Sequence, residues 1–145
     1  MYEFLRGTPA SRTPNRLVLE VAGVGYELVV PAGAAFPDAA PLVVWTHLAV
    51  REDAHTLYGF PDRATRDLFR LLLRVKQVGP GVAIAILSGL SRADLLAAIR
   101  DEDAARLMQV KGVGRKTAEQ VLLDLRDRIG DHLVELAPAA APRAG

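Results

Sequence analysis

The chain has 145 residues and a mass of 15.6 kDa, enough for one large domain or two small ones with modest cores. Half of its residues are hydrophobic, 24% are charged and the net charge is +1, a balance typical of a folded chain. It contains no cysteine, which excludes a disulfide framework, a thiolate metal site and a cysteine nucleophile.

Signals for metal binding, membrane insertion and export are not found. The histidines, His47, His55 and His132, do not share a helix face at ligand spacing, so we expect no metal and no other cofactor. No apolar run approaches about 18 residues, and the N-terminus lacks the regions of a secretory signal. We therefore expect a cytoplasmic protein with no membrane partner.

Short β-strands are expected before residue 61, because runs of β-branched and aromatic residues alternate there with Gly and Pro. The candidate strands are residues 3–7, 17–21, 26–30, 42–48 and 56–60. A small closed barrel is the expected arrangement, since it hides strand edges in a segment too short for two full sheets. Gly23-Val24-Gly25 resembles the start of a dinucleotide-binding fingerprint, but no third glycine or helix follows, so we interpret it as a turn.

After Pro61-Asp62 the hydrophobic period becomes helical. Single helix faces are formed by Leu68, Leu71, Leu72 and Val75, and by Ala118, Val121, Leu122, Leu125 and Ile129 in a last helix over residues 115–129. Predicted helix boundaries are Ser88-Gly89 as an end, Ser91 as a cap, Asp101 or Asp103 as the next cap, and Gly130 as the final stop. We expect an α+β, multidomain chain: a barrel over 1–63, an all-α domain over 64–132 and a flexible Ala/Pro linker over 133–145.

The helical region contains an internal duplication. Residues 75–83, VKQVGPGVA, align with residues 110–118, VKGVGRKTA, at an offset of 35 residues. In each copy a glycine-containing turn precedes a helix start. Glycine lets the backbone approach a ligand closely, and a helix begins with unpaired N–H groups at the positive end of its dipole. This layout predicts a phosphate site in each copy.

Two such sites at a fixed separation suit two phosphates across a duplex groove, with binding that is independent of base sequence and sensitive to salt. The candidate phosphate-binding residues are Lys76, Val78, Gly79, Gly81, Lys111, Gly112, Val113, Gly114, Arg115, Lys116 and Thr117. Tight helix–helix corners also favour glycine, and the net charge of +4 over residues 64–130 is small enough for an ordinary solvated surface. The duplication, together with Arg115-Lys116 in the second copy, favours phosphate binding over simple helix–helix corners.

Each copy resembles a helix-hairpin-helix motif, a DNA-binding element without base-sequence specificity. The resemblance extends over residues 1 to about 130 through GVGYE (23–27), TH (46–47), VREDA (50–54), LYGF (57–60), AILSG (85–89) and GVGRKTAE (112–119). In this order the segments resemble the RuvA family, the Holliday-junction-binding subunits of a branch migration complex. The resemblance implies an OB-fold barrel, tandem hairpins, and a homotetramer, or two tetramers, holding a four-way junction open and square-planar.

The resemblance also implies partners: a RuvB hexameric ATPase that drives branch migration and a RuvC resolvase, in recombination, DNA damage repair and the SOS response, with no catalytic activity in this chain. Two departures stand out. Gln77 and Gly81 replace the first Gly and the Lys of the family's GVGPK hairpin, so we expect the second hairpin to bind phosphate more strongly. The family's third, motor-binding domain is missing, so we expect a truncated form or proteolytic core that couples poorly to the motor.

Glu52 and Asp53 lie between two predicted strands, where two solvated turn acids are the simplest interpretation. In RuvA-like proteins the matching pair forms an acidic pin at the tetramer centre. Such a pin would repel the phosphates of an uninterrupted duplex, while the hairpins attract the arms of a junction. Two adjacent acids without a supporting ligand are weak support for a metal-dependent nuclease.

Two other function classes remain open on the sequence. A helix-hairpin-helix repair enzyme, a glycosylase or nuclease, needs an activated Lys or Asp or a metal cluster, and residues 117–120 offer no evident nucleophile. A protein-interaction module would need no DNA contact at all. Strand cleavage or failure to bind DNA at low salt would identify these alternatives.

Overall fold

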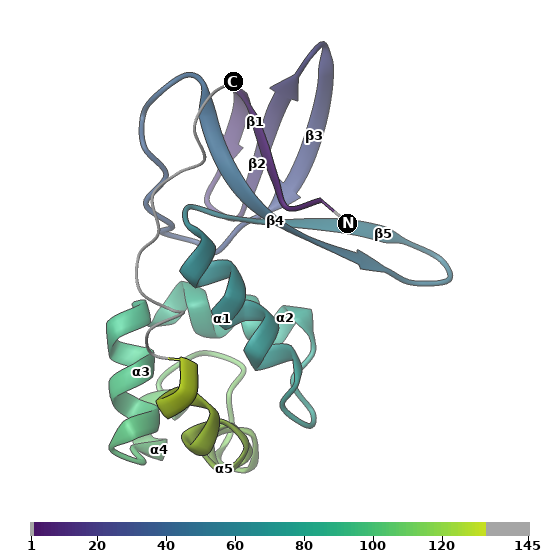
Figure 1. The fold of residues 1–145 in the computed structure, drawn as a ribbon. Coiled ribbons are helices and arrows are strands. Elements are labelled where there is room, and N and C mark those ends of the chain that lie inside the picture. The colour runs from purple at the N-terminus through teal and green to yellow at the C-terminus, as the bar shows by residue number, and fades with distance from the viewer. Residues whose placement is uncertain (1, 133–145) are drawn as a thin grey trace. The chain divides into compact units, whose positions relative to one another are not determined.

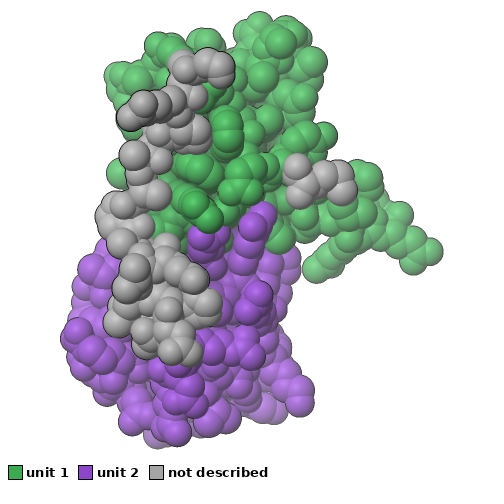
Figure 2. Space-filling model, in the orientation of Figure 1, with its two compact units in different colours: residues 1–66, 138–145 green, residues 67–137 purple. Residues whose placement is uncertain are grey.

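The computed structural model describes residues 2–132 and divides into two compact units between Arg66 and Asp67 (Figure 2). Its strands are β1 (Phe4–Thr13), β2 (Arg16–Val21), β3 (Val24–Val29), β4 (Leu42–Val50) and β5 (His55–Phe60). Its helices are α1 (Arg63–Leu73), α2 (Pro80–Gly89), α3 (Arg92–Arg100), α4 (Ala104–Met108) and α5 (Arg115–His132) (Figure 1). The predicted linker, residues 133–145, lies outside the described residues.

The strands of the first unit form a closed barrel in the order β1-β2-β3-β5-β4, which confirms the predicted OB-like architecture. All neighbouring pairs are antiparallel except β3 and β5, which run parallel through Leu28↔Leu57 and Val29↔Tyr58. Because successive side chains of a strand point to opposite faces, each strand sends alternate residues inside. The barrel core consists of Leu5, Leu17, Leu19, Leu28, Val30, Phe36, Leu42 and Val44.

The first strand is longer than predicted and reaches Thr13 instead of ending at Gly7. It pairs first with β4 and then with β2, and the register shifts between Pro9 and Ser11. Proline cannot donate to a ladder, and an irregularity of this kind accommodates it. Gly7 stands where β1 leaves no room for a side chain, since a Cβ there would lie 2.2 Å from the Glu20 carbonyl oxygen. In the sequence pattern alone, that glycine marks a strand end.

One charged side chain of the first unit is buried. The Arg66 guanidinium donates to the Glu3 carbonyl at 2.9 Å and to the Glu3 carboxylate at 2.8 Å, and it lies 5.4 Å from the centre of the Trp45 ring. The neighbouring buried hydroxyl, Thr46 Oγ1, donates to the Tyr2 carbonyl at 2.8 Å. These bonds attach the N-terminal segment to β4 and to the first turn of α1, and they satisfy polar groups that would otherwise be costly to bury.

The predicted helix faces are buried in the second unit: Leu68, Leu71, Leu72 and Val75, and Ala118, Val121, Leu122 and Leu125. The Ser91 hydroxyl accepts the Asp94 amide at 3.1 Å, as expected for a cap. Of the two predicted caps for α4, Asp103 is the one used, because its carboxylate accepts the Arg106 amide at 3.1 Å.

The prediction that Gly130 stops the last helix is wrong: α5 continues through it to His132, the last described residue. A glycine inside a helix costs only about 1 kcal/mol relative to alanine, which the rest of a long helix can offset. The side chain of Ile129, also predicted to face the core, lies outside the described part of the structure.

No single helix among the described residues combines the length and the apolar character needed to cross a membrane. The pair α2 and α3 meets that test only when taken together, and a bend of 102° separates them.

Candidate nucleic-acid interface

The two copies of the repeat fold into matching hairpins, named here the first hairpin (residues 74–81) and the second hairpin (residues 109–116). Their backbone hydrogen bonds coincide position by position at the offset of 35 residues. These bonds are Val78 N–H to Val75 O at 3.1 Å and Ala83 N–H to Gly79 O at 3.0 Å, and Val113 N–H to Val110 O at 3.1 Å and Ala118 N–H to Gly114 O at 2.9 Å. The duplication seen in the sequence is therefore a duplication of backbone geometry.

Both hairpins present their turns at the surface. The glycines Gly79, Gly81, Gly112 and Gly114 are exposed. The first amides of α2 and α5 have no acceptor inside their helices, and among residues 2–132 no other acceptor for them is found. Exposed, unpaired N–H groups at a positive helix end are the arrangement that binds a phosphate oxygen.

Val78 and Val113 differ from the other predicted phosphate-binding residues. Each side chain is 6% exposed, and each amide already donates within its own turn. Neither valine has a free donor for a phosphate, so the structure gives both a packing role beneath the turn. Their exposed neighbours retain the candidate binding groups.

The second hairpin carries more positive charge than the first. Lys111, Arg115 and Lys116 are exposed around it, and Thr117 is half-buried in the first turn of α5. The first hairpin has two exposed cations, Arg74 and Lys76, and its helix begins with Pro80, which has no N–H to donate. This geometry agrees with the expected inequality between the two sites.

Gln77 occupies the position that Gly112 takes in the second hairpin. Its φ is +71°, and that of Gly112 is +94°, so both turns need a left-handed residue at this point. Such a conformation brings Cβ close to the backbone and costs a residue other than glycine about 1–2 kcal/mol. The first hairpin therefore contains local strain that the second avoids.

Replacing Gln77 with glycine is expected to raise the free energy of unfolding by about 0.5–1 kcal/mol, because relief of strain exceeds the extra flexibility of the unfolded chain. The converse change, Gly112→Gln, should lower it by about the same amount, since no heavy atom lies within 4 Å of the Cβ position and only strain is added. Urea unfolding measures both. Equal stability of the two variants would contradict the strained conformation of Gln77.

The arginine of the second hairpin is paired in the free protein. Arg115 Nε donates to Glu119 Oε1 at 3.2 Å, one turn along α5, and both side chains are largely exposed at 79% and 61%. A phosphate that binds Arg115 must compete with this carboxylate. Exposed pairs of this kind contribute about 0.2–1 kcal/mol.

Glu119→Gln is therefore expected to tighten DNA binding by up to about fivefold, by freeing Arg115 and removing a negative charge near the phosphate. Glu102→Gln is the matched control: it removes the carboxylate that accepts Arg126 at 2.9 Å, and both of these residues lie outside the two hairpins. Titration of one duplex with both variants separates the local effect from the change in net charge. Equal tightening by both would show that Glu119 has no particular influence on Arg115.

The acidic pair lies at the turn that joins β4 and β5. The Arg51 amide donates to the Ala54 carbonyl at 2.8 Å and the Ala54 amide returns a bond at 3.4 Å, so Glu52 and Asp53 form a two-residue loop. Both side chains are exposed, and the hairpin extends away from the rest of the barrel (Figure 1). Within the described residues no group of three His, Asp or Glu side chains is placed to hold a metal ion.

Two side chains at the hairpins were not anticipated from the sequence. Glu119 is one turn from Arg115, and its spacing of four residues on a predicted helix is a signal that identifies such pairs. Asp124 bonds the backbone of the first hairpin, 48 residues earlier in the chain, and no local pattern marks it.

Comparison with known families covers most of the chain. The model described as RuvA N terminal domain matches residues 1–59, and the model described as SAM-like helix-hairpin-helix tandem matches residues 69–127. The two matches correspond to the barrel and to the helical unit with its two hairpins.

Individual relatives match over nearly the whole chain. A protein of Alkalilimnicola ehrlichii is 48% identical over 141 residues, which cover 95% of this chain and 67% of that protein. A protein of Halorhodospira halophila is 47% identical, with 97% and 70% covered. One of Pseudomonas entomophila is 49% identical, with 86% and 62% covered. Each is named Holliday junction branch migration complex subunit RuvA, and the identity, the coverage and the two domain matches together show that the chain belongs to the RuvA family.

Proposed function

We propose that this chain binds four-way DNA junctions through their phosphate backbones, without reading base sequence. The observation that carries the proposal is the pair of matching hairpins, each with exposed amides at a helix start. A phosphate accepts such amides through its charge and oxygens, whichever base is attached. The relatives are named as subunits of a Holliday junction branch migration complex, which agrees with this ligand.

Selection of a junction over a continuous duplex is assigned to Glu52 and Asp53. Their exposed loop bears two carboxylates and lies in the barrel unit, separate from the basic hairpins of the helical unit. In a fourfold assembly the acidic loops would meet at the centre. There the carboxylates would repel the phosphates of an uninterrupted duplex. In an open, square-planar junction the strands diverge at the centre, so few phosphates would meet them.

The proposed assembly is a tetramer, or two tetramers around one junction, in the cytoplasm. The chain serves in it as a non-catalytic DNA-binding subunit. The ATP-driven movement of the junction would come from a RuvB hexamer, and resolution from RuvC. Sedimentation of the protein with junction DNA is expected to give a mass near that of a tetramer or a pair of tetramers, and a monomer bound to the junction would contradict this architecture.

The decisive experiment compares an immobile four-way junction with a linear duplex of the same arm sequence, titrated over a range of salt concentrations. Preference for the junction, no strand cleavage and a steep salt dependence are expected, because phosphate contacts release counterions. Nicked or abasic product would instead indicate a repair enzyme. Failure to bind either DNA at low salt would indicate a protein-interaction module.

A further inference from the structure

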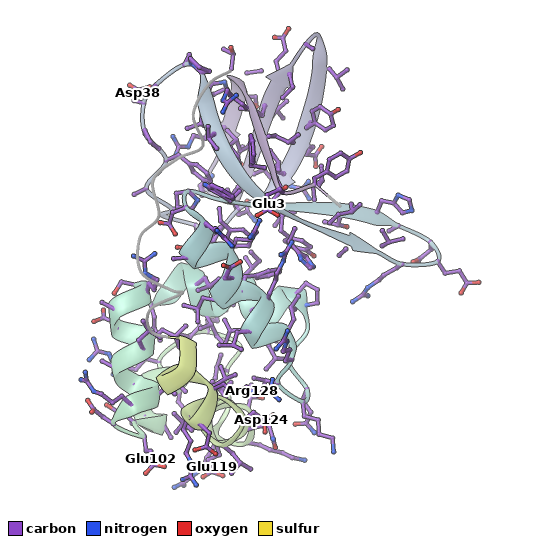
Figure 3. The ribbon with its side chains drawn as sticks, viewed as in Figure 1. Glu3, Asp38, Glu102, Glu119, Asp124 and Arg128 are labelled. Atoms are coloured by element: carbon purple, nitrogen blue, oxygen red, sulfur yellow. The ribbon has the colours of Figure 1, made fainter. Side chains whose placement is uncertain are left out.

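A side chain of α5 ties the first hairpin to the helix that starts at the second. The carboxylate of Asp124, which is labelled in Figure 3, accepts the Lys76 amide through Oδ2 at 3.3 Å and the Gln120 side-chain amide through Oδ1 at 2.9 Å. Asp124 is half-buried, and Lys76 lies in the turn of the first hairpin. The bond therefore joins α5 to the backbone that positions the first candidate phosphate site.

The same helix begins at the second hairpin. Arg115 is its first residue and Asp124 follows nine residues later. At 1.5 Å per residue, the two positions lie about 14 Å apart along the helix axis. Since a hydrogen-bonded helix is stiff, α5 keeps Arg115 and Asp124 at this separation, and the bond from the Lys76 amide connects the first hairpin to it.

The second copy of the repeat has no equivalent of this contact. At the offset of 35 residues Gly89 replaces Asp124 and Ala85 replaces Gln120. A Cβ on Gly89 would lie 3.1 Å from the Val110 side chain, so α2 packs directly against the second hairpin. Among residues 2–132 no side chain accepts the Lys111 amide, and a cavity of about 410 Å³ is found beside it.

Both hairpins are packed through buried valines, but they differ in one further contact. Gly89 of α2 packs against the Val110 side chain at the second hairpin, whereas at the first hairpin the Lys76 amide donates to Asp124. A carboxylate near a phosphate site weakens the attraction for DNA, so its negative charge works against binding. What Asp124 contributes to the hairpin is its hydrogen-bond acceptor.

We propose that Asp124 is a positioning residue, which holds the first hairpin at the distance from the second hairpin needed for both to contact phosphates of one DNA arm. This inference rests on the proposed function and adds to it a residue that touches no DNA. It implies that the acceptor oxygen of Asp124 matters and its charge does not. The two properties are separable, because an asparagine keeps the oxygen and loses the charge.

The test uses Asp124→Ala and Asp124→Asn, with Asp127→Ala and Asp127→Asn as controls. Asp127 is an acid of the same helix whose side chain is 88% exposed and bonded to neither hairpin. Asparagine at position 124 can accept the Lys76 amide and donate to the Gln120 oxygen after the Gln120 amide flips, so both bonds survive. Junction and duplex are titrated with each variant over a range of salt, and hydrogen exchange of the Lys76 amide is measured by NMR.

We expect Asp124→Ala to weaken binding about 2- to 30-fold, the range found for residues that act through others. The slope of log affinity against log salt should fall by about 0.9 for each phosphate that the variant no longer binds. Asp124→Asn should bind at least as tightly as the wild type, as should both controls. The Lys76 amide should exchange faster only in Asp124→Ala.

If Asp124→Ala binds DNA as tightly as Asp127→Ala and keeps the wild-type salt slope, the inference is overturned. The proposed function is unaffected by that result. Weakening by Asp124→Asn equal to that by Asp124→Ala would also overturn it, because charge would then be the cause. Fast hydrogen exchange of the Lys76 amide in the wild-type protein would by itself contradict the inference, because the bond to Asp124 should slow that exchange. Absence of DNA binding by the wild type would overturn the proposed function as well.

Discussion

Arg115→Ala combined with Lys116→Ala is expected to weaken binding to junctions and linear duplexes by the same factor. Both side chains are exposed at the first two positions of α5, beside the unpaired amides. A charge-assisted hydrogen bond to phosphate contributes about 1.5 kcal/mol or more, so removing each such bond should lower the affinity roughly tenfold. The slope of log affinity against log salt should decrease by about 0.9 for each phosphate released in this way.

Fluorescence titration of a labelled junction and a labelled duplex at several salt concentrations provides this measurement. Arg100→Ala with Arg126→Ala removes the same charge from exposed positions outside both hairpins and serves as the control. Alanine is a strong helix former, so the fold of α5 should be unaffected. A salt slope that does not change in the double variant would exclude Arg115 and Lys116 as phosphate ligands.

Glu52→Gln combined with Asp53→Asn is expected to raise DNA affinity instead of lowering it, and to do so for linear duplex only. Removing the two charges at the β4–β5 turn should strengthen binding to linear duplex, because a continuous backbone no longer meets carboxylates. Affinity for the junction should change little, so the preference for the junction should fall by roughly tenfold, the scale of a few unfavourable like-charge contacts.

The measurement is the ratio of duplex to junction dissociation constants at one salt concentration. Asp38→Asn with Glu20→Gln is the matched control, since both acids are exposed in the same unit and lie outside the turn; Asp38 is labelled in Figure 3. If the control lowers the preference as much as the Glu52 and Asp53 pair does, net charge and not a central acidic loop explains selectivity. An unchanged ratio in the Glu52 and Asp53 variant would show that this loop does not select the junction.

The two double variants test separate parts of one electrostatic arrangement. The cations of the helical unit should set how tightly any DNA is held, and the acids of the barrel unit should set which DNA structure is accepted. Like-charge repulsion suits the second task because it acts against unwanted ligands without requiring a base contact. Independent effects of the two variants on affinity and on preference are therefore expected.

The sequence determined much of the local structure and the location of both hairpins. Strand alternation, the cap at Ser91, and the buried faces of α1 and α5 follow from patterns within a few residues, which is the range over which backbone preferences act. The sequence offered Asp101 and Asp103 for the next cap, and the structure decided between them. The duplication was visible because matched turns need matched residues, valine beneath the turn and glycine at the helix start. The departure at Gln77 was visible too, although its left-handed φ became evident only in the folded chain.

Tertiary structure alone decided the contacts that join distant parts of the chain. Arg66 is buried because Glu3 and Trp45 surround it, and Gly7 faces the backbone of β2. No local sequence pattern encodes either of these contacts. From the sequence, Asp124 is only a polar residue on a predicted helix. In the folded chain its carboxylate lies 3.3 Å from the Lys76 amide nitrogen, 48 residues earlier in the sequence. The physical reason is that periodicity reports which face of an element is apolar, whereas the partner of a polar group depends on how the elements pack.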